Sequence, residues 1–197
     1  MTETMQNTIS EFEIEGDTLV RYHGKSTHVV IPETVKRIGN AAFWLSKDIS
    51  SVVIPVGVTD IGERAFECCG ALRQVVLPEG LVAIGYRAFY GCGALTDITL
   101  PDSVRRIAAH AFCDCTALVD LHIPGKIALI GEYAFCNCAS VTAVDIPATV
   151  DTIGKQAFYG CRSLGHITIP KRYKPQMKGL FGLVRLGLFG RVKIVFI

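Results

Sequence analysis

Proline recurs along this chain at an interval that never changes. A proline stands at every twenty-third position of the repeated region, and these residues are Pro32, Pro55, Pro78, Pro101, Pro124, Pro147 and Pro170. A fixed period of this length indicates stacked copies of one small unit, because a single copy cannot bury its apolar side alone. The chain is therefore not expected to form a closed globule, and its function must be sought on a repeated surface.

Several other positions keep the same period. An aliphatic residue precedes each proline, and in six copies an isoleucine lies six residues after it. Each of these copies contains an Ala-Phe pair, and in five of them a cysteine lies three residues after the phenylalanine, while Ser46 takes that place in the first. The repeated residues are Phe43, Phe66, Phe89, Phe112, Phe135 and Phe158, with Cys69, Cys92, Cys115, Cys138 and Cys161.

The pattern of one unit predicts one short strand and one tight turn. Residues one and three before each proline are expected to point inward, and residues two and four before it outward. Proline ends the strand because it has no N–H to donate to a ladder. The Ala-Phe segment is expected to pack on the opposite wall as a short helical or 3₁₀ turn. Parallel strands about 4.8 Å apart would then stack identical residues into ladders.

The run IPxxVxxIGxxAFxxCxxLxxVxIP, which residues 29–170 carry, resembles the bacterial leucine-rich-repeat class of the BspA surface-antigen type. The resemblance implies a right-handed repeat solenoid with a parallel sheet on its concave face. It also implies a binding or adhesion role. It provides no catalytic residues and no cofactor to carry over to this chain.

The two ends differ from the repeats and predict caps. Residues 1–28 are expected to form a tail and a capping hairpin, since the sequence alternates on both sides of Gly16-Asp17, and residues 1–10 are expected to be frayed. Residues 29–170 form six repeats, and residues 171–197 a degenerate seventh repeat or C-terminal cap. Half of all residues are apolar and 19% are charged, so one domain with a sizeable core is expected.

The C-terminal segment 171–197 holds seven basic residues and no acidic one, so the rest of the chain carries a net charge of −5. A membrane span is disfavoured because Arg185, Arg191 and Lys193 interrupt the apolar run. A membrane-surface helix is a second interpretation, although these charges do not share one helical face.

We favour a seventh repeat for this tail, because Phe181 and Val184 lie one full repeat after Phe158 and Cys161. Residues 192–197 are expected as a last strand, displaced by about two residues, with Lys193 pointing outward. The apolar residues of 179–197 should then cover the final coil. The free edge of that strand could pair two copies of the chain.

The cysteines predict buried, reduced thiols at the five repeat positions. Cys113 and Cys136 are different, because each lies one residue after a core phenylalanine and forms Cys-x-Cys with Cys115 or Cys138. Four such thiols could hold zinc, but alternate residues of a turn tend to face different ways, and zinc motifs more often use Cys-x-x-Cys. We expect no metal, and leave open whether Cys113 and Cys136 pair.

The outward strand positions provide the candidate partner-binding residues. The first three strands present valine, and the later strands present aspartate and histidine. These candidates are Val30, Val53, Val76, Asp97, Asp120, His122, Asp145 and His166. An Asp/His cluster can be a metal or acid–base site, but here it is interpreted as the polar surface of a solvated sheet. No phosphate loop, nucleophile elbow or His-Glu-x-x-His motif occurs.

These features predict a non-enzymatic protein–protein interaction scaffold that uses the sheet face, with a cell-surface adhesin or carbohydrate-binding module as the alternative. The absence of aromatic residues from the outward strand positions favours a protein partner. Neither nucleic acid nor a membrane span is expected. The first residues lack a basic segment followed by an apolar one, which predicts a cytoplasmic protein, or a surface or secreted one if the sequence is a trimmed piece.

Overall fold

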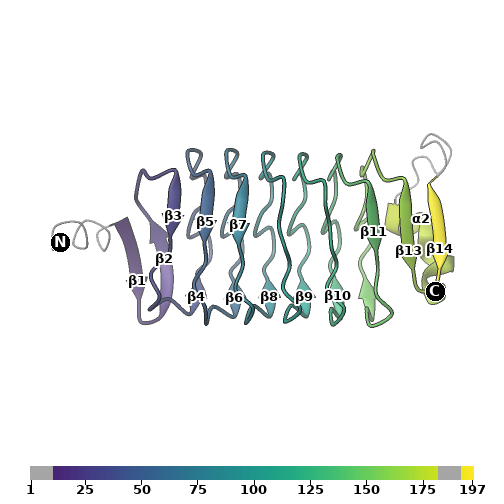
Figure 1. The fold of residues 1–197 in the computed structure, drawn as a ribbon, viewed down its shortest axis with the longest axis horizontal. Coiled ribbons are helices and arrows are strands. Elements are labelled where there is room, and N and C mark those ends of the chain that lie inside the picture. The colour runs from purple at the N-terminus through teal and green to yellow at the C-terminus, as the bar shows by residue number, and fades with distance from the viewer. Residues whose placement is uncertain (1–10, 182–191) are drawn as a thin grey trace.

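The computed structural model describes residues 11–181 and 192–197. Successive coils stack along one axis into a solenoid, and the N-terminal hairpin and the last strand lie at opposite ends of it (Figure 1). Each coil contributes to three walls, which are two parallel sheets and one wall of turns. The predicted repeat solenoid with a parallel sheet is thus confirmed, and the structure adds a second parallel sheet.

The first sheet consists of the strands that precede the prolines. Strands β3, β5 and β7 form one parallel part, and β11, β13 and β14 form another. Between these parts the ladder is reduced to two isolated bridges, from Gln74 to Asp97 and from Asp97 to Asp120. The bounds are β3 (His28–Val30), β5 (Ser51–Val53), β7 (Gln74–Val76), β11 (Ala143–Asp145), β13 (His166–Ile169) and β14 (Lys193–Phe196).

The second sheet consists of two-residue strands that end at the repeated isoleucine. They pair in parallel from β2 to β12, and β1 adds to the N-terminal end in antiparallel orientation. In every one of these short strands the isoleucine is buried. The bounds are β1 (Phe12–Glu15), β2 (Thr18–Tyr22), β4 (Arg37–Ile38), β6 (Asp60–Ile61), β8 (Ala83–Ile84), β9 (Arg106–Ile107), β10 (Leu129–Ile130) and β12 (Thr152–Ile153).

The third wall is built from the Ala-Phe segments. In place of helix, it shows single turns closed by 3₁₀-type hydrogen bonds, such as that from Glu67 N to Arg64 O at 3.0 Å. Left-handed residues separate these turns, two positions before and two positions after each phenylalanine. Those with a side chain are Ala41, Leu45, Arg64, Cys68, Arg87, His110, Asp114, Tyr133, Asn137 and Gln156.

A left-handed residue other than glycine costs about 1 kcal/mol or more, and hydrogen bonds between coils offset this cost here. The backbone N–H of Arg64 donates to the carbonyl of Tyr86 at 2.8 Å, and that of His110 donates to Glu132 at 2.9 Å. The turn wall is therefore a ladder between coils, as the two sheets are.

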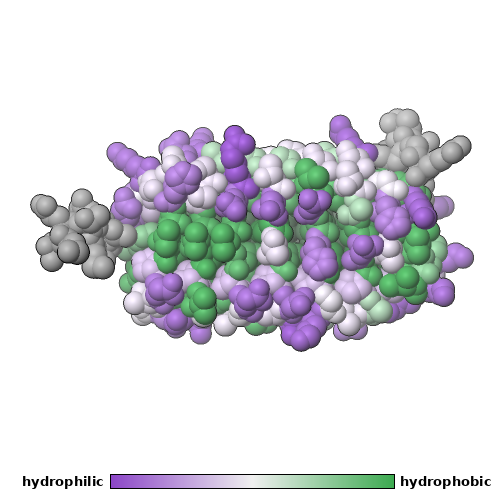
Figure 2. Space-filling view, in the orientation of Figure 1, coloured by the Kyte–Doolittle hydropathy of each residue, from purple (hydrophilic) through white to green (hydrophobic). Residues whose placement is uncertain are grey.

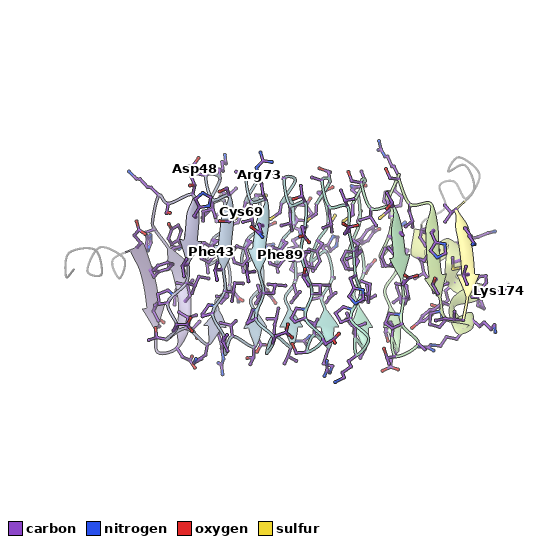
Figure 3. The ribbon with its side chains drawn as sticks, viewed as in Figure 1. Phe43, Asp48, Cys69, Arg73, Phe89 and Lys174 are labelled. Atoms are coloured by element: carbon purple, nitrogen blue, oxygen red, sulfur yellow. The ribbon has the colours of Figure 1, made fainter. Side chains whose placement is uncertain are left out.

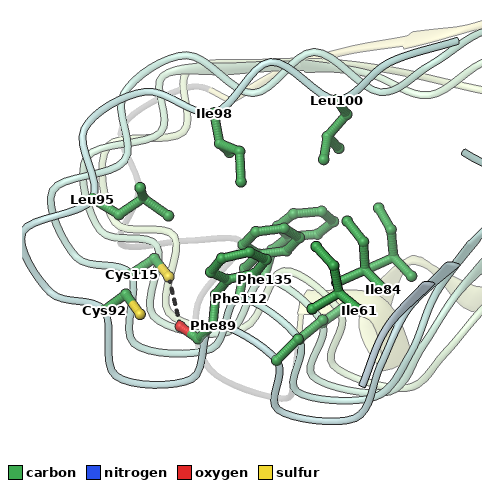
Figure 4. Packing of buried hydrophobic residues seen from close by; sticks show 14 of the residues in the cluster. Ile61, Ile84, Phe89, Cys92, Leu95, Ile98, Leu100, Phe112, Cys115 and Phe135 are labelled. Carbon is green, nitrogen blue, oxygen red and sulfur yellow. Dashed lines mark hydrogen bonds between the residues drawn. The ribbon is translucent and has the colours of Figure 1, made fainter. Parts of the chain in front are cut away.

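The core is a stack of identical side chains. The six repeat phenylalanines are buried, and neighbouring rings lie 4.7–5.5 Å apart with interplanar angles of 2–9°. Figure 4 shows this stack between the isoleucines of the second sheet and the aliphatic residues of the first. Figure 3 shows Phe43, Phe89 and Cys69 inside the coil, whereas Asp48 and Arg73 project outward.

The predicted burial of the five repeat cysteines is confirmed, since all are free and at most 4% exposed. Each thiol donates to the carbonyl of the phenylalanine in the preceding coil, at 3.0–3.2 Å. The dashed line in Figure 4 marks the bond from Cys115 to Phe89. Cysteine thus fills the core and also donates to a backbone acceptor of the neighbouring coil.

The glycine after the repeated isoleucine allows the coils to approach closely. A Cβ on Gly85 would lie 2.7 Å from the carbonyl carbon of Gly62 and from the carbonyl oxygen of Ile61. Ala108 is the one alanine at this position in the six repeats.

The N-terminal hairpin predicted around Gly16-Asp17 is present, with β1 and β2 antiparallel. Tyr22 extends the ring stack, 5.2 Å from Phe43. The hairpin therefore covers the first coil with aromatic side chains. The expectation that residues 1–10 are frayed lies outside the described residues.

The C-terminal end contains two short helices and a last strand, and the assignment of residues 171–197 as a degenerate seventh repeat or cap stays a prediction. Phe181 stacks 6.1 Å from Phe158, at the end of the short helices η1 (Lys171–Gln176) and α2 (Met177–Phe181). Strand β14 pairs in parallel with β13 and places Lys193 beside His166, on the outward side. Lys193 lies four positions later than the repeat period would place the partner of His166, so the predicted displacement of about two residues was wrong. Val184, Arg185 and Arg191, with the apolar residues between 182 and 191, lie outside the described residues.

Candidate interaction surface

The exposed side of β3, β5 and β7 carries a row of valines, which we call the apolar stripe. Val30 is 66% exposed, Val53 39% and Val76 47%. The three residues are directly in register across the sheet. Figure 2 shows an apolar band across these strands, bordered on both sides by polar residues. The predicted outward orientation of these residues is confirmed.

A polar row borders the apolar stripe on the same three strands. It consists of His28, Ser51 and Gln74, which are also in register. The imidazole Nδ1 of His28 and the hydroxyl of Ser51 lie 2.8 Å apart. The surface thus combines an apolar row with hydrogen-bonding groups, as protein-binding surfaces commonly do.

The middle of the sheet face is acidic, and its ladder is weaker. Asp97 and Asp120 are both exposed and lie directly opposite one another in the bridge between their coils. Like charges in opposed positions disfavour pairing, so the Asp97–Asp120 pair is expected to weaken the ladder between these two coils, whereas the isolated bridge from Gln74 to Asp97 has no such pair. A cavity of about 150 Å³ lies beside Asp97 and is lined also by Val76, Thr99 and Pro101. The end of the apolar stripe therefore opens onto an acidic recess.

The remaining aspartate and histidines spread over the later coils. The imidazole Nε2 of His166 lies 3.9 Å from a carboxylate oxygen of Asp145, and His122 is exposed. Within the described ranges, no group of three or more His, Cys, Asp or Glu residues converges as a metal site would require. The residues are thus outward, as predicted, but they do not form one acid–base or metal cluster.

Sequence reasoning missed a second surface, on the wall of turns. Arg87 lies over the rings of Tyr86 and Tyr90, at 5.3 and 4.8 Å from their centroids. His110 stacks on Tyr133 with a centroid separation of 5.0 Å. We call these five residues the turn-wall cluster. The turn-wall cluster presents aromatic rings at the surface, whereas the outward strand positions carry no Phe, Tyr or Trp.

The charges of the turn-wall cluster are partly buried. The buried carboxylate of Glu67 lies 3.4 Å from Arg87 and 3.5 Å from Arg64. Burial, and then the nearby charge of Arg87, lowers the pKa of His110. A hydrogen bond to Asp114 is the main cause of a raised pKa of Tyr90. The cluster therefore presents a neutral imidazole beside a fixed cation at neutral pH.

A sequence signal for this cluster existed. Arg64, Arg87, His110 and Tyr133 occupy one repeat position in four successive copies, but nothing in that pattern shows that the position is left-handed. A cavity of about 470 Å³ lies next to the cluster, on the outer side of the second sheet, with Tyr86, Arg106 and Glu63 in its lining.

The four thiols considered for zinc point in different directions. Cys115 and Cys138 donate to the carbonyls of Phe89 and Phe112 in the core. Cys113 instead faces Asp114 and Cys136 on the outer side of the turn wall. The Cys-x-Cys pairs therefore do not provide one tetrahedral site.

The sequence profile described as "BspA type Leucine rich repeat region" matches six copies in this chain, over residues 16–142 and 82–183. A comparison with curated protein sequences finds no match. In the described residues, no helix is long and apolar enough to cross a membrane.

Several solved structures are similar to this chain. A leucine-rich repeat protein of T. pallidum is 28% identical with a TM-score of 0.78, over 92% of this chain and 97% of that one. A leucine-rich repeat protein of Bacteroides ovatus is 31% identical with a TM-score of 0.70, over 79% of this chain and 44% of that one. A leucine-rich cell surface protein of Faecalibacterium prausnitzii is 31% identical with a TM-score of 0.64, over 79% and 52% respectively. The chain thus spans nearly all of the first protein and about half of the other two.

Proposed function

Because the chain belongs to the BspA-type leucine-rich repeat family, we propose that it is a non-catalytic scaffold that binds a protein through its first sheet. The apolar stripe of Val30, Val53 and Val76 forms the centre of the contact. The exposure of these three valines in register is the observation that carries the proposal. Interface cores are apolar and surrounded by a polar rim, and the row of His28, Ser51 and Gln74 supplies one side of that rim.

The charge beside the stripe indicates the chemistry of the partner. Asp97 and Asp120 lie one and two coils beyond Val76. A partner that suits this surface carries an apolar ridge for the valines and a lysine or arginine for the two carboxylates. Opposite charges across an interface raise the association rate and fix the orientation of the partner.

A substitution pair tests this role. Val53→Asp places a charge in the stripe, and Val82→Asp places the same charge on a valine of similar exposure, 42%, outside the first sheet. Each full-length variant is used to capture proteins from the native source of the chain. The amount of each captured protein is then compared with the amount that the unmodified chain captures. We expect Val53→Asp to lose one specific partner by roughly tenfold or more, since a buried unpaired charge costs several kcal/mol, while Val82→Asp retains it. Equal retention by both variants contradicts the proposal.

A cell-surface adhesin that binds carbohydrate is the second candidate. The turn-wall cluster supports it, because aromatic faces provide large apolar contact area beside groups that can hydrogen-bond. The similar Faecalibacterium prausnitzii protein is a cell surface protein. A glycan array probed with the intact chain and with Tyr86→Ala tests this candidate. Binding that depends on Tyr86 and not on Val53 would favour the adhesin over the scaffold.

We also propose that two copies can associate through β14. Among the described residues, β14 pairs with β13 along one edge and with no strand along the other. An open edge is a template for pairing with another strand. Sedimentation velocity over a range of concentrations tests this proposal, and a monomer throughout that range contradicts it.

A further inference from the structure

Seven of the eight cysteines form two kinds of site, and the eighth, Cys68, is a half-buried thiol at the left-handed position two residues after Phe66. The five repeat thiols point inward, are nearly inaccessible and donate to backbone carbonyls. Burial raises the pKa of the Cys69 and Cys161 thiols to about 12, and it also raises the pKa of the other three thiols well above its ordinary value. Since the thiolate is the reactive form, these five are chemically inert in the folded protein.

Cys113 and Cys136 form the second kind of site, on the outer side of the turn wall. They occupy the same position in adjacent coils, one residue after Phe112 and Phe135, whose rings are 5.4 Å apart. The N–H of Asp114 donates to the carbonyl of Cys136 at 2.8 Å, so the two segments are hydrogen-bonded neighbours. The coil spacing at this wall, which the 5.4 Å between the Phe112 and Phe135 rings indicates, falls within the Cα separation of roughly 4.4–6.8 Å that a disulfide spans.

The two thiols interact with one another. A hydrogen bond from Cys113 is the main cause of a lowered pKa of Cys136, and the same interaction raises the pKa of Cys113. The Cys113 thiol also lies 3.6 Å from a carboxylate oxygen of Asp114. The amide of Asn137 donates to the other oxygen of that carboxylate at 2.8 Å and thereby fixes it. The two thiols and the Asp114 carboxylate therefore lie together, and Cys136 is the thiol whose deprotonated form is favoured.

The pair retains some contact with solvent. Cys113 is 5% exposed and Cys136 6%, whereas four of the inward cysteines are 0% exposed and Cys161, in the last of these coils, is 4% exposed. The packing of the coil does not require cysteine at this position, because the other four coils carry Trp44, Glu67, Tyr90 and Tyr159 there. Two thiols in consecutive coils thus form a distinct local site.

We propose that Cys113 and Cys136 are a redox-active thiol pair that a small-molecule disulfide oxidises to a disulfide between adjacent coils. The Cys136 thiolate attacks one sulfur of the small disulfide, whose S–S bond breaks and releases one thiolate, which takes up the proton that Cys136 has lost. Cys113 then loses its proton and attacks the Cys136 sulfur of the mixed disulfide. A bond forms between the two cysteine sulfurs, and the second small thiol leaves with the proton. Two protein thiols are oxidised, and one disulfide is reduced to two thiols.

The experiment uses the full-length, folded chain carrying Cys68→Ser, which removes the half-buried thiol that would react independently, with oxidised glutathione as the probe. We expect one disulfide per chain, seen as the loss of two hydrogen atoms in the intact mass and mapped by peptide analysis to Cys113 and Cys136. Their reaction should be faster than that of the five inward cysteines by roughly tenfold or more, because those thiolates are scarce. Reversal by excess reduced glutathione completes the test.

Two further substitutions in the Cys68→Ser chain distinguish the roles of the thiols. Cys113→Ser should stop at one glutathione attached to Cys136, because the resolving thiol is gone. Cys136→Ser should leave Cys113 largely unmodified. Cys115→Ala serves as the matched control and should still form the disulfide, with circular dichroism confirming that each variant is folded. Absence of the disulfide in the folded chain, modification spread over the inward cysteines, or equal glutathione attachment in both variants would overturn the proposal.

Discussion

The inward and outward sides of the same coils obey different constraints. In β5, Val52 is 1% exposed and Val53 39% exposed, although they are neighbours in sequence. The phenylalanine and the isoleucine six residues after proline keep one residue type over six coils, and the inward strand positions vary only among apolar residues such as Val75, Ile98 and Leu121. The outward position two before the proline changes from valine in three coils to threonine, histidine and aspartate in the next three. Each coil imposes the same packing on its interior, whereas three exposed valines in a row are a feature that the fold does not require.

The largest expected effect is on the inward side. Phe112→Ala removes one ring from the middle of the stack, where Phe89 and Phe135 lie 5.2 and 5.4 Å away. We expect a loss of about 3–5 kcal/mol in the free energy of unfolding. Val53→Thr, on the outward side, should change it by no more than about 0.5 kcal/mol. Denaturant titration of both variants measures the difference, and similar losses would remove the distinction between the two sides.

A moderate effect is expected in the row of inward cysteines. Cys115→Ala removes a fully buried group and the hydrogen bond to the carbonyl of Phe89. That carbonyl keeps the N–H of Cys92 as a donor, so the expected loss of unfolding free energy is about 1–2 kcal/mol. Ser46→Ala changes the same repeat position in the first coil, where the side chain is half-buried, and should cost about 0.5 kcal/mol or less. Equal losses from thermal melts of the two variants would contradict the role assigned to the buried thiol.

A smaller effect, of opposite sign, is expected in the acidic middle of the sheet. Asp120→Asn removes the like charge opposite Asp97, which should increase the free energy of unfolding by about 0.2–1 kcal/mol. Added salt should reduce this gain, because it screens exposed charges. Asp151→Asn, an exposed aspartate after Pro147, is the control. A loss of stability in Asp120→Asn would show that the reduced ladder has another cause.

The smallest expected effect is on the turn wall and depends on pH. Burial lowers the pKa of His110 from the value of 6.5 that the unfolded chain shows. As the pH falls through about 6.5, the unfolded chain binds this proton before the folded one does, so stability declines. The decline ends below the folded pKa. Asparagine tolerates the φ of 57° at this position, so His110→Asn keeps the backbone conformation. Its free energy of unfolding should fall less than that of the unmodified chain between about pH 7.5 and pH 5, because the titrating imidazole is gone. Identical pH profiles of the two proteins would contradict this assignment.

The sequence predicted the features that repeat on the inward side. The period placed Phe112 and Cys115 in the core, and the alternation before proline placed Val53 outward, since both patterns report directly on burial. The second sheet was missed because a strand of two residues, such as Arg37–Ile38, is too short to show alternation. The left-handed residues were missed because Arg64 and Tyr133 are not residue types that favour that conformation.

The candidate surfaces were predicted only in part for a related reason. Outward residues such as Asp145 and His166 were identified, but their separation of 3.9 Å depends on side-chain conformation. The interaction between Cys113 and Cys136 depends on which side of a turn each thiol faces, and spacing alone leaves that undetermined. The last strand lies four positions beyond the repeat because the final coil is longer than the six before it.

The three exposed valines are expected to form the centre of the surface that binds the partner protein. A photo-crosslinking amino acid, placed one position at a time, tests this expectation directly in the chain's native source. The positions are 30, 53 and 76 in the apolar stripe, 122 and 145 in the later coils, and 44 and 82 outside the first sheet. If the apolar stripe binds the partner, one common protein should be crosslinked at positions 30, 53 and 76, and none at 44 or 82. A common crosslinked partner at position 44, with none in the stripe, would contradict this expectation.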